Sequence, residues 1–227
     1  MTEAVRDSTA VVRLDVDAPI ALWAVDLRIE PDPAHVALFD STERARHQRF
    51  RFARDRRRYR AAHVALRRLL AKASGIAMPD QRFVTGDYGK PALAGQPALA
   101  FNMSYAGDVA LIGIGQGRSI GVDAEVRRQI DDLAGLADSV FTDSERLGLM
   151  AEPAGALRDA AFLQGWTRKE ACIKALGTGL SASLDFAVGV AAPPRVSTVF
   201  AEAGRTAIEV GSFRLGPMVI GAWAQRL

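Results

Sequence analysis

The sequence has a single cysteine, Cys172, among 227 residues, which excludes an internal disulfide. No apolar run approaches the roughly 18 residues that a membrane-spanning helix needs. The first residues lack the apolar block of a signal peptide. We therefore expect a cytoplasmic protein that does not enter a membrane.

Several motifs that would announce a chemistry are also missing. The sequence contains no GxSxG, no P-loop and no CxxC. Its three histidines, His35, His47 and His63, show no spacing typical of metal ligands. A chemical role therefore has to be sought in the acidic, basic and hydroxyl residues.

Lysine is scarce, and the other basic side chains are arginines. The net charge is +3, and the lysines are Lys72, Lys90, Lys169 and Lys174. A GC-rich genome would explain the abundant arginine and alanine without any function. A basic surface would also attract an acidic partner, whether nucleic acid, a phosphate ligand or an acidic protein.

The remaining pattern predicts alternating strands and helices. Hydrophobic residues recur every three or four positions from 55 to 73, which is typical of a helix with one buried face, and Ser74-Gly75 would end it. Further helices are expected to start at 40–43 and, with a capping box, at 142–145, and a long one over 156–176. Strands are predicted over 20–29, 109–115, 119–125 and 218–227, and loops over 86–97.

A weak internal repeat runs through the sequence. A long helix, a loop and a strand reading DVALIGIGQGR in the first part are followed by a long helix, a loop and a strand reading PMVIGAWAQRL in the second. This order predicts two related α+β halves that meet near residues 116–119. Because no low-complexity linker separates them, we expect the halves to pack tightly.

Two short patterns contain carboxylates. Asp123 and Glu125 end a predicted strand, so both point to the same face. A hard cation such as Mg²⁺ would relieve their repulsion, although an isolated pair of this spacing is usually a solvated strand end. Glu170 and Lys174 lie four residues apart on the long helix, where a surface salt bridge is the simplest explanation.

Other segments suit phosphate binding. Lys90 lies between Gly89 and Pro91, which could present its charge to a phosphate or simply form a loop. Asn102 and Ser104, at a predicted loop–strand junction, could bind phosphate or order the turn. The arginine-rich segment 46–58 could bind nucleic acid or be a solvated helix face.

In order and spacing, these motifs resemble the Sfp-type 4′-phosphopantetheinyl transferases. The matching blocks are QRFRFARD, GKP, FNMS, GVDAE, VFTDSE and WTRKEACIKALGTGL, within residues 20 to 190, and the last is the most specific. The resemblance implies an α+β fold of two similar halves related by a pseudo-two-fold, residues 1–117 and 118–227, with the site between them. A chain that holds both halves is expected to be a monomer.

The resemblance also implies a reaction. The family moves the 4′-phosphopantetheine arm of coenzyme A to a serine of an apo acyl or peptidyl carrier protein and releases adenosine 3′,5′-bisphosphate. Mg²⁺, with Mn²⁺ as an alternative, would bridge protein carboxylates and the pyrophosphate. Nucleic acid is not an expected partner, and the carrier could belong to fatty-acid, polyketide or nonribosomal-peptide synthesis.

The family's functional residues fall on definite positions of this sequence. The resemblance assigns the metal to Asp123, Glu125 and Glu170. Glu170 would also act as the base toward the carrier serine, and Lys174 would stabilise or protonate the departing phosphate. The positions that correspond to coenzyme A contacts are Arg46, Arg58, Lys90 and Ser104.

Tyr105 departs from the family pattern, which usually has a histidine that contacts the 3′-phosphate of coenzyme A. A tyrosine hydroxyl brings no positive charge, and a charge-assisted hydrogen bond is roughly twice as strong as a neutral one. We predict weaker, less pH-sensitive coenzyme A binding. Two alternatives remain: a relative that binds coenzyme A or a carrier without turnover, and a nucleic-acid-binding protein, which would leave the acidic residues unexplained.

Overall fold

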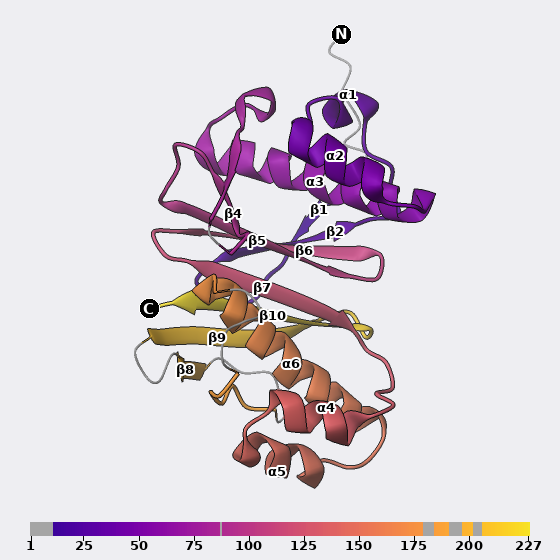
Figure 1. The fold of residues 1–227 in the computed structure, drawn as a ribbon, viewed down its shortest axis with the longest axis vertical. Helices are drawn as coiled ribbons and strands as arrows, with labels where there is room; N and C mark the ends of the chain where they lie inside the picture. The colour runs from indigo at the N-terminus through magenta and orange to yellow at the C-terminus, as the bar shows by residue number, and fades with distance from the viewer. Residues whose placement is uncertain (1–10, 87, 179–183, 191–196, 202–205) are drawn as a thin grey trace.

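Two four-stranded antiparallel sheets form the centre of the molecule in the computed structural model (Figure 1). The structure describes residues 11–86, 88–178, 184–190, 197–201 and 206–227. Gly179 and Leu180, which end the WTRKEACIKALGTGL block, therefore lie outside the described residues. In the described parts of the chain, none of the helices combines the length and apolar character needed to cross a membrane.

The first half builds one sheet with helices on its outer face (Figure 1). The strand order is β1-β2-β6-β5, and β3 and β4 form a separate two-stranded ribbon. Its elements are β1 (Val11–Arg13), β2 (Ala21–Asp26), α1 (Pro33–Val36), α2 (Ser41–Arg49), α3 (Ala53–Ser74), the 3₁₀ turn η1 (Met78–Asp80), β3 (Phe83–Thr85), β4 (Pro91–Leu93), β5 (Leu99–Ala106) and β6 (Val109–Gln116).

The second half builds the other sheet, with the order β7-β10-β9-β8. Its elements are β7 (Ile120–Val126), α4 (Leu133–Val140), α5 (Asp143–Ala151), α6 (Ala156–Leu176), β8 (Ser197–Ala201), β9 (Thr206–Leu215) and β10 (Val219–Arg226). The order β2-β6-β5 in the first sheet matches β7-β10-β9 in the second, because each half runs strand, long helix, hairpin. The predicted α+β class is confirmed, and the predicted division at 117/118 falls in the turn between β6 and β7.

The first long helix, α3, buries one face against its sheet. Its core positions pack against Val25, Phe101 and Ile112, and they are Ala61, Ala62, Ala65, Leu66, Leu69 and Leu70. The helix ends where Gly75 adopts φ 76°, a left-handed conformation that glycine takes without strain. The predicted apolar face was correct except for Ala73, which is exposed.

The second long helix, α6, has the predicted bounds and is buried on most of its surface. One side packs on its sheet through Ala171, Cys172 and Ala175. Another side packs against α4 and α5 through Phe162 and Leu163. Because both sides are covered, polar residues of the helix are enclosed as well.

An apolar layer joins the two sheets. Ile20, Leu22 and Leu111 of the first half meet Ile120 and Val122 of the second. Gly113 leaves the room for this contact, since a Cβ at that position would lie 2.6 Å from Val122 Cγ1. The halves thus share a continuous core, as the tight packing predicted from the sequence requires.

Several predicted boundaries were wrong. Residues 91–93 form strand β4 inside the stretch 86–97 that was expected to be loops. Residues 99–106 form one continuous strand, so Asn102 and Ser104 lie within β5 and not at a loop–strand junction. Strand β9 and helix α4 were not predicted.

Candidate active site where the two halves meet

Strand β5 presents different residues on its two sides. Asn102 and Ser104 face the second half: the Asn102 side-chain oxygen accepts the Val122 backbone N–H at 2.8 Å, and Ser104 Oγ donates to Asp123 Oδ1 at 2.7 Å. Tyr105 lies on the other side of the strand and lines a cavity. The FNMS segment therefore connects the cavity of the first half to the acidic residues of the second.

Asp123 is the most enclosed of the predicted metal acids, with 6% of its surface exposed. Lys174 Nζ donates to its Oδ1 at 2.6 Å and lies 3.4 Å from Ser104 Oγ. Burial raises the pKa of Asp123, while the charge and hydrogen bond of Lys174 oppose the rise. One lysine from α6 thus contacts a strand of each half.

Gly121 makes this contact possible. It lies on the same face of β7 as Asp123, against α6, and a Cβ there would overlap the Ala171 carbonyl oxygen. Because β7 carries no side chain at this position, the helix comes close enough for Lys174 to reach Asp123. The close packing of β7 against α6 therefore explains the glycine of the GVDAE block.

Glu125 and Glu170 complete the acidic group. The Glu125 side chain is 28% exposed and accepts a hydrogen bond from Arg128 at 2.7 Å. Burial raises the pKa of Glu170; the positive charge of Lys174 opposes the rise, and the negative charges of Asp123 and Glu125 add to it. The three carboxylates are thus close enough to act on one another electrostatically.

Oxygen donors of this kind fit a hard divalent cation, which would relieve their mutual repulsion. Among the described residues, however, no three acidic, histidine or cysteine side chains converge into a group that could hold a metal ion. Asp123 is paired with Lys174, and Glu125 is paired with Arg128. Metal binding at these acids remains a prediction.

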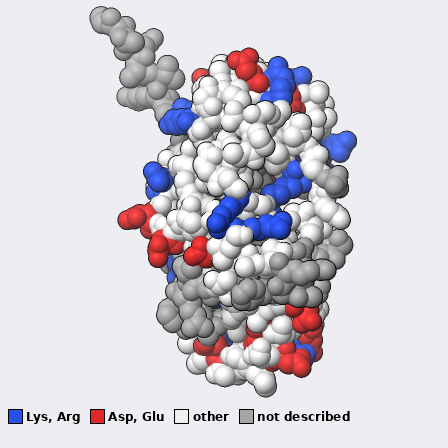
Figure 2. All heavy atoms as spheres, turned by 90° about the vertical axis from the view of Figure 1, so that its left-hand side faces the viewer, with Lys and Arg blue, Asp and Glu red and all other residues white. Residues whose placement is uncertain are grey.

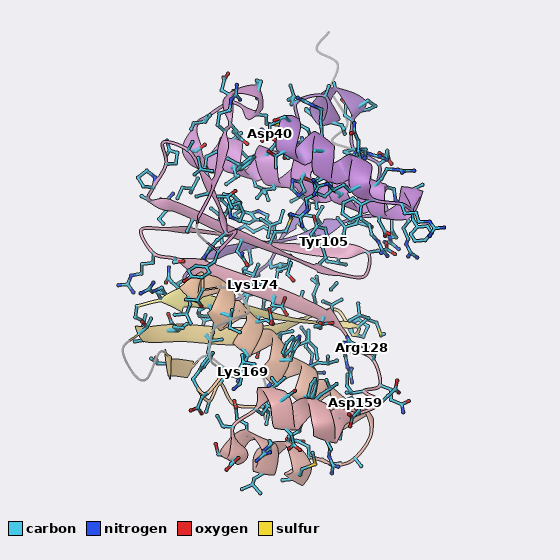
Figure 3. All side chains as sticks on the ribbon, viewed as in Figure 1. Asp40, Tyr105, Arg128, Asp159, Lys169 and Lys174 are labelled. Carbon is cyan, nitrogen blue, oxygen red and sulfur yellow. The ribbon has the colours of Figure 1, made fainter. Side chains whose placement is uncertain are left out.

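A cavity of about 650 Å³ lies in the first half. It contains Arg46 from α2, Arg58 from α3 and Tyr105 from β5, and aromatic walls from Phe50 and Tyr59. Arg58 is held by Asp108 at 2.9 Å, whereas Tyr105 is 43% exposed. Figure 3 shows Tyr105 on the first half and Lys174 across the boundary on the second.

Lys90 does not join this cavity. Its ammonium donates to Ser119 Oγ at 2.8 Å, to Ile120 O at 2.7 Å and to Lys174 O at 2.6 Å. Ser104 likewise gives its hydroxyl to Asp123. Of the four predicted coenzyme A contacts, the structure brings together Arg46 and Arg58, with Tyr105 beside them.

The arginine-rich segment is largely committed to the protein itself. Arg56 donates to Phe50 O, Arg57 to Leu27 O and Arg60 to Glu30. These bonds fix the start of α3 to neighbouring loops. The exposed arginines of the segment are Arg46, which lines the cavity, and Arg49, Arg51 and Arg54.

Lys169, in the middle of the most specific block, is structural. It is fully buried, 3.0 Å from Glu145, and donates to the carbonyls of Leu184 and Phe186. Glu145 closes the predicted capping box with Thr142 and also accepts the Val188 N–H. The glutamate at the third helical position was predicted to close the capping box, whereas its ion pair with Lys169 was not predicted.

Comparison with known proteins agrees with the architecture of two halves. The model of the 4′-phosphopantetheinyl transferase superfamily matches residues 119–212, and that of the 4′-phosphopantetheinyl transferase N-terminal domain matches residues 33–115. The chain belongs to the 4′-phosphopantetheinyl transferase family.

Individual relatives support the same assignment. The transferase ffp of Bacillus subtilis is 30% identical over 74% of this chain and 73% of its own length. HetI of Nostoc is 34% identical over 64% of this chain, and Sfp of Bacillus subtilis is 28% identical over 69%. The match spans 62% of HetI and 59% of psf-1 of Bacillus pumilus, so the chain covers about three fifths of such relatives.

Proposed function

We propose that this protein transfers the 4′-phosphopantetheine arm of coenzyme A to a serine of an acyl or peptidyl carrier protein. The other product would be adenosine 3′,5′-bisphosphate. The observation that carries the proposal is the position of Lys174, whose ammonium meets Asp123 and Ser104 at the boundary of the halves. Ser104 is followed directly by Tyr105, so β5 alone separates this cluster from the cavity.

Coenzyme A would occupy the cavity of the first half. Its volume of about 650 Å³ lies within the range of small-molecule sites, ~300–1,000 Å³. Arg46 and Arg58 supply guanidinium groups suited to phosphates, and the aromatic walls suit the adenine ring. Tyr105 would donate to the 3′-phosphate where the family usually has histidine.

In the reaction, the serine oxygen of the carrier forms a bond to the phosphorus atom that bears the pantetheine arm. The bond from that phosphorus to the bridging oxygen of the pyrophosphate breaks, and the bisphosphate leaves with the electron pair. Glu170 takes the serine proton, and its raised pKa makes it a stronger base than an ordinary glutamate. Lys174 donates a hydrogen bond to the departing phosphate.

The acids of β7 and α6 have a second task in this proposal. Asp123, Glu125 and Glu170 would hold Mg²⁺, or Mn²⁺, which when bound neutralises charge on the pyrophosphate. Before that, Lys174 would release Asp123 and Arg128 would release Glu125. Lys174 then becomes available to the leaving group, so the same change prepares both functions.

Mass spectrometry of apo-carrier proteins incubated with the protein, coenzyme A and Mg²⁺ tests the proposal. We expect one added phosphopantetheine on a serine, and no addition when a chelator is present. Binding of coenzyme A without any addition, across fatty-acid, polyketide and peptide carriers, would instead indicate a binding protein. Nucleic-acid binding that weakens steeply with salt and needs no Mg²⁺ would contradict the proposal as well.

A further inference from the structure

Lys90 belongs to the first half by sequence and to the second half by its contacts. It immediately precedes β4, yet its ammonium reaches Ser119 Oγ, Ile120 O and Lys174 O at 2.6–2.8 Å. A lysine ammonium has three donors, and all three are used here. No donor is left over for a phosphate while these bonds persist.

Two of these three acceptors connect Lys90 to the C-terminal end of α6: Lys174 O directly, and Ser119 Oγ through its bond to Ala175 O. The last carbonyls of a helix have no partner within the helix, and Lys174 O and Ala175 O are such groups. Lys90 binds the first, and Ser119 Oγ donates to the second at 2.7 Å while it accepts from Lys90. A cation at this position also suits the negative end of the helix dipole.

The terminus of α6 is therefore fixed by groups from outside the helix. Gly177 ends the helix at φ 74°, and a Cβ there would lie 3.6 Å from Lys90 Cδ, so the lysine stem packs along the terminus. The face in Figure 2 shows basic side chains gathered at the level where the halves meet. Burial and, second to it, the positive charge of Arg226 lower the pKa of Lys90 to about 8.

Both ends of Lys174 are thereby held. Its carbonyl accepts from Lys90, and its ammonium donates to Asp123 and lies near Ser104. A shift of the last turn of α6 would move the ammonium relative to these two residues. Displacing a reacting group by 1 Å can lower a rate about 100-fold.

We propose that Lys90 is a positioning residue: it fixes the C-terminal turn of α6 and so sets the place of the Lys174 ammonium at the boundary of the halves. This inference rests on the proposed function for its kinetic consequence, but not for its structural one. It differs from the role implied by the resemblance, in which Lys90 contacts coenzyme A.

The structural consequence can be measured without any substrate. The chain has four lysines, so labelling with ¹³Cε-lysine gives four resolvable side-chain signals. Lys90→Met should remove one signal and shift that of Lys174, while the signal of Lys72 stays unchanged. The matched control Lys72→Met, on the exposed side of α3, should leave the Lys174 signal unchanged. An unchanged Lys174 signal in Lys90→Met would overturn the proposal.

Kinetics and affinity then separate positioning from phosphate contact. For Lys90→Met we expect kcat for carrier modification to fall about 10- to 100-fold. The coenzyme A dissociation constant, measured by calorimetry, should stay within about threefold of the parent. A loss of affinity of tenfold or more with an unchanged kcat would favour the phosphate contact and contradict positioning.

If Lys90→Met does not fold, Ser119→Ala removes one of its acceptors and the bond to Ala175 O more gently. A smaller shift of the Lys174 signal in the same direction supports the proposal, and no shift contradicts it. If the parent itself modifies no carrier, the proposed function fails, whereas the lysine spectra still decide the role of Lys90.

Discussion

Glu43 on α2 reaches Arg67 on α3 in the first half, and Glu145 on α5 reaches Lys169 on α6 in the second. Each glutamate completes a capping box at the start of its short helix, and each cation follows 24 residues later on the long helix. Both cations are almost completely buried. The two halves thus repeat a buried ion pair as well as an order of strands.

The surroundings of the two pairs differ. Glu43 also contacts His63 at 3.1 Å, and both residues line the cavity. Glu145 instead accepts the N–H groups of Val188 and Gly189, and Lys169 binds the carbonyls of the same segment. The ion pair in the first half borders the cavity. The ion pair in the second half is instead covered by residues 184–189 of the same chain.

The candidate chemistry lies on only one of the two helices. Counted from the buried cation, Lys174 on α6 corresponds to Lys72 on α3, and Glu170 corresponds to Arg68. Lys72 is exposed, whereas the Lys174 ammonium contacts Asp123 of its own half and Ser104 of the other half (Figure 3). In the proposed function, the repeated scaffold would therefore serve binding in the first half and catalysis in the second.

The largest expected effect on turnover comes from replacing the candidate catalytic residues, which lie on α6 and not on α3. Glu170→Gln and Lys174→Met should each lower the turnover of carrier modification by ~10²–10⁴, the range for loss of a proton-transfer group. Their counterpart Lys72→Met should change turnover less than twofold. Equal losses at Lys72 and Lys174 would show that the assignment of chemistry to α6 is wrong.

Next come the two buried pairs, which should matter equally to folding. Removing one partner of a buried ion pair leaves an uncompensated charge and costs about 3–5 kcal/mol. We expect losses of this size in the free energy of unfolding for Lys169→Met and for Arg67→Met, measured by urea denaturation. The double variant Glu145→Gln/Lys169→Met should recover most of the loss. A loss below about 1 kcal/mol in either single variant would argue against a stabilising buried ion pair in that half.

The pair in the first half should also shape the acid stability of the protein. Burial opposes the ionisation of Glu43, but hydrogen bonds with His63 and Arg67 outweigh it and lower its pKa to about 2. Because the pKa is lower in the folded state, the stabilisation is complete above the ordinary value of 4.5 and is lost as the pH falls toward 2. The difference in unfolding free energy between the parent and Glu43→Gln should shrink between pH 5 and pH 2.5. A constant difference over that interval would count against this pKa.

The smallest expected effect lies in the cavity. Tyr105→His should lower the Michaelis constant for coenzyme A a few-fold at pH 6 and less at pH 8, because only the protonated imidazole adds charge. Tyr105→Phe serves as the control that removes the hydroxyl alone. Identical Michaelis constants for parent and Tyr105→His from pH 6 to pH 8 would remove Tyr105 from the phosphate site.

Local pattern was enough for much of the scaffold. The bounds of α6, the end of α3 and the capping box at Thr142 follow from periodicity, glycine and capping chemistry, and the structure confirms them. Strand β9 alternates buried and half-buried residues over most of its length, but Gly211 interrupts the pattern.

The contacts between the candidate site residues could not be predicted from local sequence pattern. They join residues 19, 51 and 84 positions apart: Ser104 with Asp123, Asp123 with Lys174, and Lys90 with Lys174. No local period relates such positions, so the sequence indicated candidate site residues but not which of their atoms are in contact. Burial of Lys169 was equally unpredictable, since a charged residue enters a core only when partners from other elements are present.

Cys172 lies on the side of α6 that packs on the sheet of the second half, and it is fully buried. Burial raises the pKa of its thiol to about 12, although Arg168 and Lys169 act in the opposite direction. A maleimide reagent should therefore leave Cys172 of the native protein unmodified. The same reagent should modify the new thiol that phosphopantetheine adds to a carrier. The same reagent, used without a carrier, would report each opening of the second core as an irreversible label, and so measure how often α6 leaves its sheet.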